Sequence, residues 1–403
     1  MREFRPAAAC ISMSAANRRD SAQILVLIVF TALIYFCTGL PLAVLPGYVH
    51  NSLGYSSAMA GLVISAQYLT TLLARPLTSS LCDQLGPRRA VIYGLLACGL
   101  SGLLTLLAIS LDNLPVVTLG GLLLGRVLLG AAQGLMGTGA LSWAIARAGV
   151  AHTARVISWN GVAVYGAIAI GAPLGMTLAD RFGVWSLGAV TLALALGGLL
   201  LIRRQAALPV SSEARLPFRN VFGRVLPGGL TLALGTLGYG TLSTFVALYF
   251  TNRGWDGAGY ALSAFGAAFI GARLLFSGSI GRWGGYRVAL ACLGVELMGL
   301  LLIWLAPGPT LVFAGAALTG LGLSMLYPAL AVEVIQQVPA SSRSSALGAF
   351  ALFFDLALGL AGPLMGWLIP FTGLAGIFAV SALFTVIGLV LGVRLLLGAR
   401  AAS

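Results

Sequence analysis

The chain has 403 residues, of which 59% are hydrophobic and 8% are charged, and its mean hydropathy is +1.00. About a quarter of the residues of a soluble domain are charged, so this composition cannot cover a surface in water and excludes a soluble protein. The formal net charge of +13 could suggest a nucleic-acid partner, but the basic residues follow a membrane pattern instead. We therefore expect a lipid bilayer as partner and no nucleic acid.

Apolar segments follow one another along the chain, each long enough to cross a bilayer, which takes about 20 residues in a helix. The first segment begins at Gln23 and is too long for the core of a signal peptide, so we interpret it as a retained helix. The runs are continuous rather than alternating, which favours helices over the strands of an outer-membrane barrel. The predicted spans are 23–49, 57–79, 90–110, 114–146, 156–179, 184–202, 225–251, 258–280, 288–306, 310–338, 344–368 and 371–397.

One sizeable polar connection, residues 203–224, separates six predicted helices from the next six. The sequence thus predicts an all-α membrane protein with twelve transmembrane helices in two pseudo-symmetric six-helix bundles. The predicted parts are an N-terminal tail (1–22), a first bundle (23–202), a linker (203–224), a second bundle (225–397) and a C-terminal tail (398–403).

All 23 basic residues are arginines, and most of them fall in the two termini and in alternate loops on one side of the predicted membrane. Because cytoplasmic loops carry an excess of basic residues, we expect both termini in the cytoplasm. An even number of helices agrees with this. We expect a multi-pass protein of a bacterial inner (plasma) membrane, and a monomer.

Internal repetition supports two related halves, since transporter halves are often repeats with weak sequence symmetry. At an offset of 198 residues, Arg75 falls on Arg273 and Gly86 falls on Gly284. At an offset of 190 residues, Pro173 falls on Pro363. The change of offset predicts one net deletion near the third and fourth helices of the second half.

The loop after the second predicted helix, SSLCDQLGPRR, is similar to the G-x-L-x-D-R-x-G-R-R signature of the major facilitator superfamily. Asp83, Gly86, Arg88 and Arg89 match, whereas Ser79 and Gln84 depart from the pattern. The resemblance extends over essentially the whole chain and is closest to bacterial proton-driven exporters of the arabinose-efflux-permease type. It implies that Asp83 meets the positive N-terminal end of the helix that begins near Ser344 and closes the cytoplasmic side.

Two further patterns carry the same resemblance. GRVLLGAAQG in the fourth helix resembles the family's R-x-x-x-G-x-x-x-G segment, and its Arg126 is a functional candidate because a buried arginine is costly in a membrane. The fifth helix resembles the family's antiporter signature, which implies export, and the eleventh helix repeats it. The residues of this pattern that suit a rocking helix are Gly171, Pro173, Gly362 and Pro363.

Three acidic residues lie inside predicted helices. Asp355 lies near the midplane, where desolvation favours the protonated carboxyl, so it is the first choice for a proton carrier. Glu333 is interpreted either as a second titrating group or as a gate partner of Arg343. Glu296 is expected to make a buried structural hydrogen bond. Arg75 and Arg273 lie nearer the cytoplasmic helix ends, where snorkelling to the interface and a functional role are equally favoured.

The predicted function is secondary active transport: proton-coupled efflux of a small polar or amphipathic organic molecule by alternating access. The candidate cavity residues are Arg126, Gln133, Asn160, Tyr165, Tyr35, Tyr239, Tyr327 and Phe354. The alternatives are a proton symporter that imports an anionic metabolite attracted by Arg126, and a non-transporting membrane partner protein. No clustered nucleophile, base or metal-ligand set is visible, so we expect no enzyme activity, no cofactor and no metal.

Overall fold

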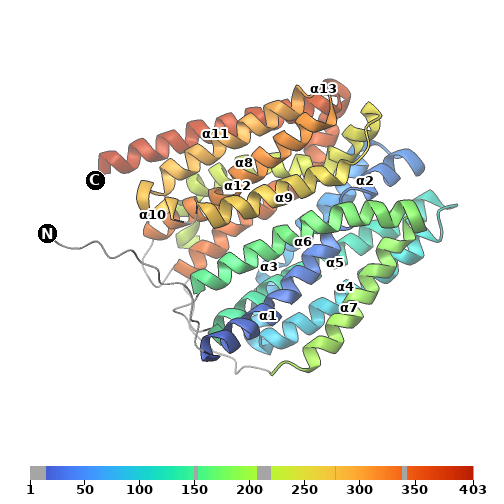
Figure 1. Ribbon diagram of the computed structural model, residues 1–403, viewed down its shortest axis with the longest axis horizontal. Helices are drawn as coiled ribbons and strands as arrows, with labels where there is room; N and C mark the ends of the chain where they lie inside the picture. The colour runs from blue at the N-terminus through green and yellow to red at the C-terminus, as the bar shows by residue number, and fades with distance from the viewer. Residues whose placement is uncertain (1–14, 149–152, 207–218, 277, 338–342, 403) are drawn as a thin grey trace.

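The computed structural model describes residues 15–148, 153–206, 219–276, 278–337 and 343–402, and every regular element within these ranges is helical. Inside the helices, the side chains of some residues, Asp83 and Arg343 among them, lie outside the described part. Long helices run side by side through the molecule (Figure 1). The short helix α10 (Ser279–Trp283) marks one end of the molecule, here called the α10 end, and α2 (Leu45–Gly47) marks the opposite end, called the α2 end.

The first bundle contains α1 (Ala15–Gly39), α3 (Ser57–Leu85), α4 (Pro87–Ile109), α5 (Pro115–Ala148), α6 (Thr153–Phe182) and α7 (Trp185–Arg203). Helix α5 packs against α1, α3 and α4, while α4 also packs against α7 and α1 against α6. A π-helical turn (Tyr48–Ser52) follows α2 on the way to α3. Ser56 caps the start of α3, because its hydroxyl accepts a hydrogen bond from the Met59 N–H at 3.3 Å.

The second bundle contains α8 (Arg219–Arg253), α9 (Ala258–Leu275), α11 (Gly285–Trp304), α12 (Pro309–Gln336) and α13 (Arg343–Ala402). Helix α12 packs against α11, α9 and α8, and α13 packs against α8 and α11. The 60 residues of α13 are twice what one crossing needs. Its backbone is not helical at Gly373, where φ is 74° and ψ is 169°, so α13 supplies two crossings joined by a tight turn.

Ten of the described helices are long and apolar enough to cross a membrane. The apolar part of α13, Gly348–Ala399, counts once among these ten but crosses twice, and α1 contributes a shorter apolar segment, Leu27–Gly39. The prediction of an all-α membrane protein with twelve crossings is confirmed. The linker boundaries remain a prediction, because residues 207–218 lie outside the described part.

Matching contacts relate the two bundles. Gly86 and Gly284 both end one helix and begin the next, with φ values of 85° and 82°, a backbone conformation that side chains disfavour. A Cβ atom at Gly130 would collide with the backbone oxygen of Gln67, and one at Gly320 would collide with that of Phe265. Both pairs follow the offsets of 198 and 190 residues that the sequence predicts.

The bundles meet along two interfaces, between α3 and the first crossing of α13 and between α6 and α9. Both are tight toward the α2 end. A Cβ atom at Gly61 would lie 2.5 Å from the Gly362 oxygen, and one at Gly259 would lie 2.8 Å from the Pro173 Cα. Helix α2 also contacts α8 across the bundles. The small residues let the backbones approach, and the α2 end is closed in this structure.

Candidate functional site

An ion pair joins the two bundles. Arg75 Nε on α3 donates to Asp355 Oδ2 on α13, and the two residues are separated by 280 positions in the sequence. The Asp355 side chain is 6% exposed and that of Arg75 is 34% exposed. Because each partner comes from a different bundle, the charge on Asp355 affects how the bundles hold together.

Tyrosines surround this pair. Tyr35 on α1 and Tyr327 on α12 both lie within electrostatic range of Arg75 and Asp355. Tyr327 also packs against Phe354, with ring centroids 6.4 Å apart. The structure therefore brings four residues of the sequence-predicted site together, two of them hydroxyl-bearing rings from opposite bundles.

A network of amides extends from the ion pair into the first bundle. Gln133 Nε2 on α5 donates to the Tyr35 hydroxyl at 3.3 Å, and Gln67 Nε2 on α3 donates to Gln133 Oε1 at 2.6 Å and to the Thr38 hydroxyl at 2.9 Å. Arg126 Nη1 donates to Gln67 Oε1 at 3.2 Å. This chain of contacts connects the predicted cavity residues Arg126, Gln133 and Tyr35.

Arg126 is held without an acidic partner. The residue is 4% exposed, its Nε makes no hydrogen bond, and the groups within electrostatic range are Tyr68, Cys37 and Cys98. A buried guanidinium that is only partly satisfied can attract an anionic or strongly dipolar group. The structure places Arg126 inside the first bundle rather than at a membrane surface.

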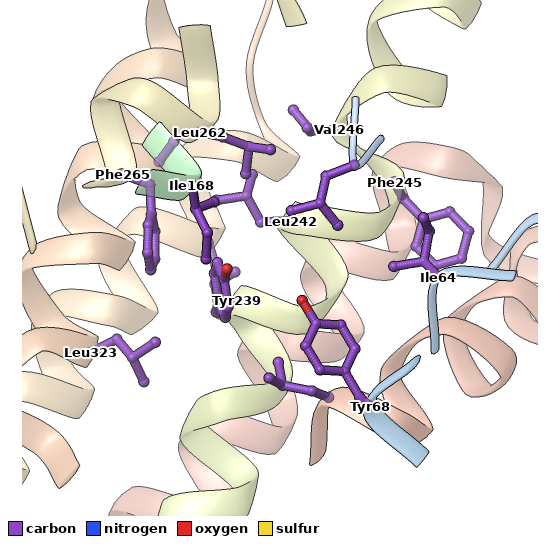
Figure 2. Close-up of a cluster of buried hydrophobic side chains, with 14 of the residues drawn as sticks. Ile64, Tyr68, Ile168, Tyr239, Leu242, Phe245, Val246, Leu262, Phe265 and Leu323 are labelled. Carbon is purple, nitrogen blue, oxygen red and sulfur yellow. The ribbon is translucent and has the colours of Figure 1, made fainter. Parts of the chain in front are cut away.

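An aromatic cluster closes the space between the bundles toward the α2 end. Tyr165 stacks on Phe269 with ring centroids 3.6 Å apart, and Tyr239 stacks on Phe265 at 4.6 Å. Figure 2 shows Tyr68 and Tyr239 among the apolar side chains of this region, and the Tyr239 hydroxyl has no hydrogen-bond partner. The predicted cavity residues Tyr165 and Tyr239 thus belong to a packed barrier in this structure.

Glu333 and Asn160 lie apart from the ion pair. Glu333 Oε1 accepts hydrogen bonds from the N–H groups of Gly285 at 2.7 Å and Tyr286 at 3.2 Å, at the start of α11. A carboxylate is favoured there by the helix dipole. The Asn160 side-chain oxygen on α6 is buried without a hydrogen-bond partner. Neither residue has a described contact with Asp355.

The loop motif is only partly described. Arg88 Nη2 donates to the carbonyl of Ile202 at 3.5 Å, and Arg89 is exposed. The side chains of Asp83 and Arg343 lie outside the described part, so the latch that the resemblance implies stays a prediction.

The glycine and proline pattern lies at helix contacts. Gly362 meets Gly61 across the α3–α13 interface, and Pro173 meets Gly259 across the α6–α9 interface. Gly171 faces α1 within the first bundle, where an added Cβ would lie 3.0 Å from the Phe36 oxygen. Pro363 follows Gly362 inside α13. The pattern therefore serves close packing on both interfaces.

Sequence reasoning did not single out Gln67 and Tyr68, and it left the role of Arg75 open. The two α3 residues belong to no motif, and their signal was only that polar groups stand inside an apolar run. The offset that pairs Arg75 with Arg273 marked both arginines, but not the acid that one of them meets.

The sequence profile of the Major Facilitator Superfamily matches residues 27–285 and 257–403, nearly the whole chain. The chain belongs to this superfamily. An uncharacterized MFS-type transporter of Pseudomonas aeruginosa is 51% identical over 384 residues, covering 95% of this chain and 96% of the relative. One from Burkholderia mallei is 46% identical over 369 residues, covering 92% and 91%.

Solved structures share the superfamily fold. The human organic anion transporter MFSD10 (TETRAN) aligns with a TM-score of 0.69 and 17% identity, covering 93% of this chain and 99% of that one. A point mutant of the nucleoside transporter NupG aligns with a TM-score of 0.71 and 16% identity, covering 92% and 99%. The protein is therefore a multi-pass secondary transporter, and not an enzyme. Among the described residues there is no group of three acidic, histidine or cysteine side chains that could hold a metal ion.

Proposed function

We propose that the protein is a proton-coupled exporter of a small polar or amphipathic organic molecule, with the Arg75–Asp355 pair as its coupling element. The observation that carries this proposal is the position of the pair: a buried carboxylate on α13 holds an arginine on α3 of the other bundle. A single proton on Asp355 cancels the charge that makes this contact. Proton binding is thereby linked to the relative position of the bundles.

The working cycle follows from that link. With Asp355 ionised, the pair draws α3 and α13 together; with Asp355 protonated, Arg75 loses its counter-charge and the interface can separate. A ligand that binds between the bundles and a proton on Asp355 would then favour different arrangements. Proton influx would drive the substrate outward in the opposite step of alternating access.

The direction of transport rests on two sequence features. The arginine distribution predicts cytoplasmic termini, which would turn the closed α2 end toward the outside. The glycine and proline pattern around Pro173 and Pro363 resembles the antiporter signature of the family. Both features support export across a bacterial inner membrane, with the substrate loaded from the cytoplasm.

The substrate site would lie beside the ion pair, among Tyr35, Gln133 and Tyr327. Amide and hydroxyl groups next to aromatic rings suit a molecule with both polar and apolar parts. Two solved relatives by fold carry such cargo by name, an organic anion transporter and a nucleoside transporter.

One observation favours a second candidate, proton symport of an anionic metabolite. Arg126 is buried with no carboxylate beside it among the described side chains, which suits an anionic ligand. A symporter would use the same Asp355 but would move the proton and the anion in one direction.

Proton flux in inverted membrane vesicles separates the two candidates. Vesicles with an acidified lumen would be given organic anions and nucleosides in turn, and the pH of the lumen would be recorded. Export by antiport alkalinises the lumen when substrate is added outside, whereas symport toward the outside does not respond to substrate added there. Asp355→Asn should abolish the response, and Asp180→Asn, which changes an exposed acid, should keep it. A wild-type response in the Asp355→Asn variant would refute the coupling role.

A further inference from the structure

Glu296 is an acidic residue that the coupling site does not use. It lies on α11 with 0% exposure, and neither carboxyl oxygen has a hydrogen-bond partner. The expectation that Glu296 makes a structural hydrogen bond is therefore wrong. Helix α11 packs against α8, α12 and α13 of its own bundle.

Glycines on two neighbouring helices make the space for this side chain. A Cβ atom at Gly238 of α8 would lie 2.7 Å from Glu296 Oε1, and one at Gly235 would lie 3.4 Å from Oε2. A Cβ atom at Gly322 of α12 would lie 2.8 Å from the Glu296 Cβ. The side chains of Leu293 and Leu300 approach the same α8 glycines. The carboxyl group is thus enclosed by backbone and leucines, without a polar side chain to receive it.

The first bundle has a different arrangement at the equivalent position. At the offset of 198 residues, Glu296 corresponds to Cys98 and Gly235 corresponds to Cys37. The thiols of Cys37 and Cys98 are hydrogen-bonded to each other. In the second bundle, glycine replaces one of the two facing side chains and a carboxyl group fills the space, so the acid is a feature of that bundle alone.

No charge compensates Glu296 among the described residues. Cys292, on α11 itself, is the titratable group within its electrostatic range, and no charged or titratable group from α8, α12 or α13 acts on it. An ionised carboxylate in such a place is costly, because neither water nor a partner stabilises it. The packing seen here therefore requires the neutral acid.

We propose that Glu296 is a second proton-binding carboxyl, separate from the Arg75–Asp355 pair, that reacts with hydrophobic carbodiimides from within the membrane. The acid adds across one C=N bond of the reagent: its oxygen bonds to the central carbon and its proton moves to a nitrogen. The resulting O-acylisourea rearranges to a stable N-acylurea, so that no group leaves and nothing is oxidised. Only the protonated carboxyl takes part in this addition.

The purified full-length protein would be treated with dicyclohexylcarbodiimide and, in parallel, with a water-soluble carbodiimide. Peptide mass spectrometry would locate the adducts. We expect a whole-reagent adduct on Glu296 with the hydrophobic reagent, little or none with the water-soluble one, and a loss of labelling as the pH is raised. The adduct should persist in Asp355→Asn and disappear from that position in Glu296→Gln. Glu296→Met, which keeps the volume without polar atoms, replaces Glu296→Gln if the amide does not fold.

The wild-type experiment alone can overturn the proposal. Absence of an adduct on Glu296, while another carboxyl of the same protein is modified, would show that the group is not a neutral acid open to the membrane. Equal labelling by the water-soluble reagent would show that the carboxyl is hydrated. Labelling independent of pH would contradict a proton-binding role.

Discussion

The α3–α13 and α6–α9 interfaces occupy equivalent places in the two bundles but differ in chemistry. Gly61, Ser65 and Arg75 of α3 correspond to Gly259, Ser263 and Arg273 of α9 at the offset of 198 residues. On the facing helices, Asp355 corresponds to Tyr165 at the offset of 190 residues. Arg75 therefore meets a carboxylate, whereas Arg273 lies beside a tyrosine.

The second arginine is held by neutral groups. Arg273 Nη2 donates to the Ser324 carbonyl at 2.9 Å, and its guanidinium carbon lies 5.3 Å from the centroid of the Phe269 ring. These contacts do not change when a carboxyl group gains a proton. The comparison teaches that the two interfaces share one geometry, and that only the α3–α13 interface is built to respond to protonation.

The largest effect should come from removing the arginines. Arg75→Ala leaves Asp355 without its cation, which costs up to about 3–5 kcal/mol if the carboxylate stays ionised. The loss should be greatest in alkaline buffer and small in acidic buffer, because the protonated acid needs no counter-charge. Arg273→Ala should cost about 1–2 kcal/mol at every pH. Melting temperatures of both variants across pH check this, and equal pH profiles would contradict the asymmetry.

Adding a methyl group at the close helix contacts should have the next largest effect. Gly61→Ala forces α3 against the Gly362 backbone, which cannot move aside, and should destabilise the closed α2 end by about 1–3 kcal/mol. Gly259→Ala should cost less, since one of the atoms it meets is the flexible Met176 sulfur. Gly271→Ala, where nothing lies within 4 Å, is the control. Thiol labelling of a cysteine introduced at the α2 end measures the opening.

The serines test the same interfaces more gently. Ser65 donates to the Leu358 carbonyl at 3.3 Å and accepts from the Gly362 N–H at 3.1 Å, so Ser65→Ala removes two contacts between the bundles. Ser263→Ala removes one, to the Ala169 carbonyl at 2.6 Å. We expect losses of about 0.5–1.5 kcal/mol in thermal unfolding, with Ser65→Ala the larger. The reverse order would show that the single short bond dominates.

The smallest effect is expected at the tyrosine that replaces the acid. Tyr165→Phe keeps the ring that stacks on Phe269 and should change the stability by no more than about 0.5 kcal/mol. Its transport rate should keep the wild-type dependence on pH. A clear change in that dependence would mean that the α6–α9 interface also takes part in proton coupling.

The fold could be predicted because bilayer thickness fixes the length of an apolar helix, and twelve such lengths stand in the sequence. The turn inside α13 was predicted near residues 368–371 and lies at Gly373. The repeat offsets also predicted which residues occupy equivalent places, since the two bundles share their glycine contacts. These features depend on local pattern or on spacing, which a single sequence displays.

The partners in the site could be predicted only in part. Asp355 stood out because an acid in a membrane helix is costly, but its partner Arg75 is 280 residues away and lies on a helix of the other bundle. Glu333 carried the same signal and instead accepts two backbone hydrogen bonds at the start of α11. Cost alone identifies a buried charge, and only the packing of the helices decides what stabilises it.

The Arg75–Asp355 pair also has an electrical consequence. Its two protonation states differ by one elementary charge, whatever the other arginines contribute. Carrying one charge across the full membrane potential involves about 2.3 kcal/mol per 100 mV. The proton-loaded reorientation of the bundles should therefore be the voltage-sensitive half of the cycle, and the negative interior of a bacterium would accelerate it in the direction that brings protons in.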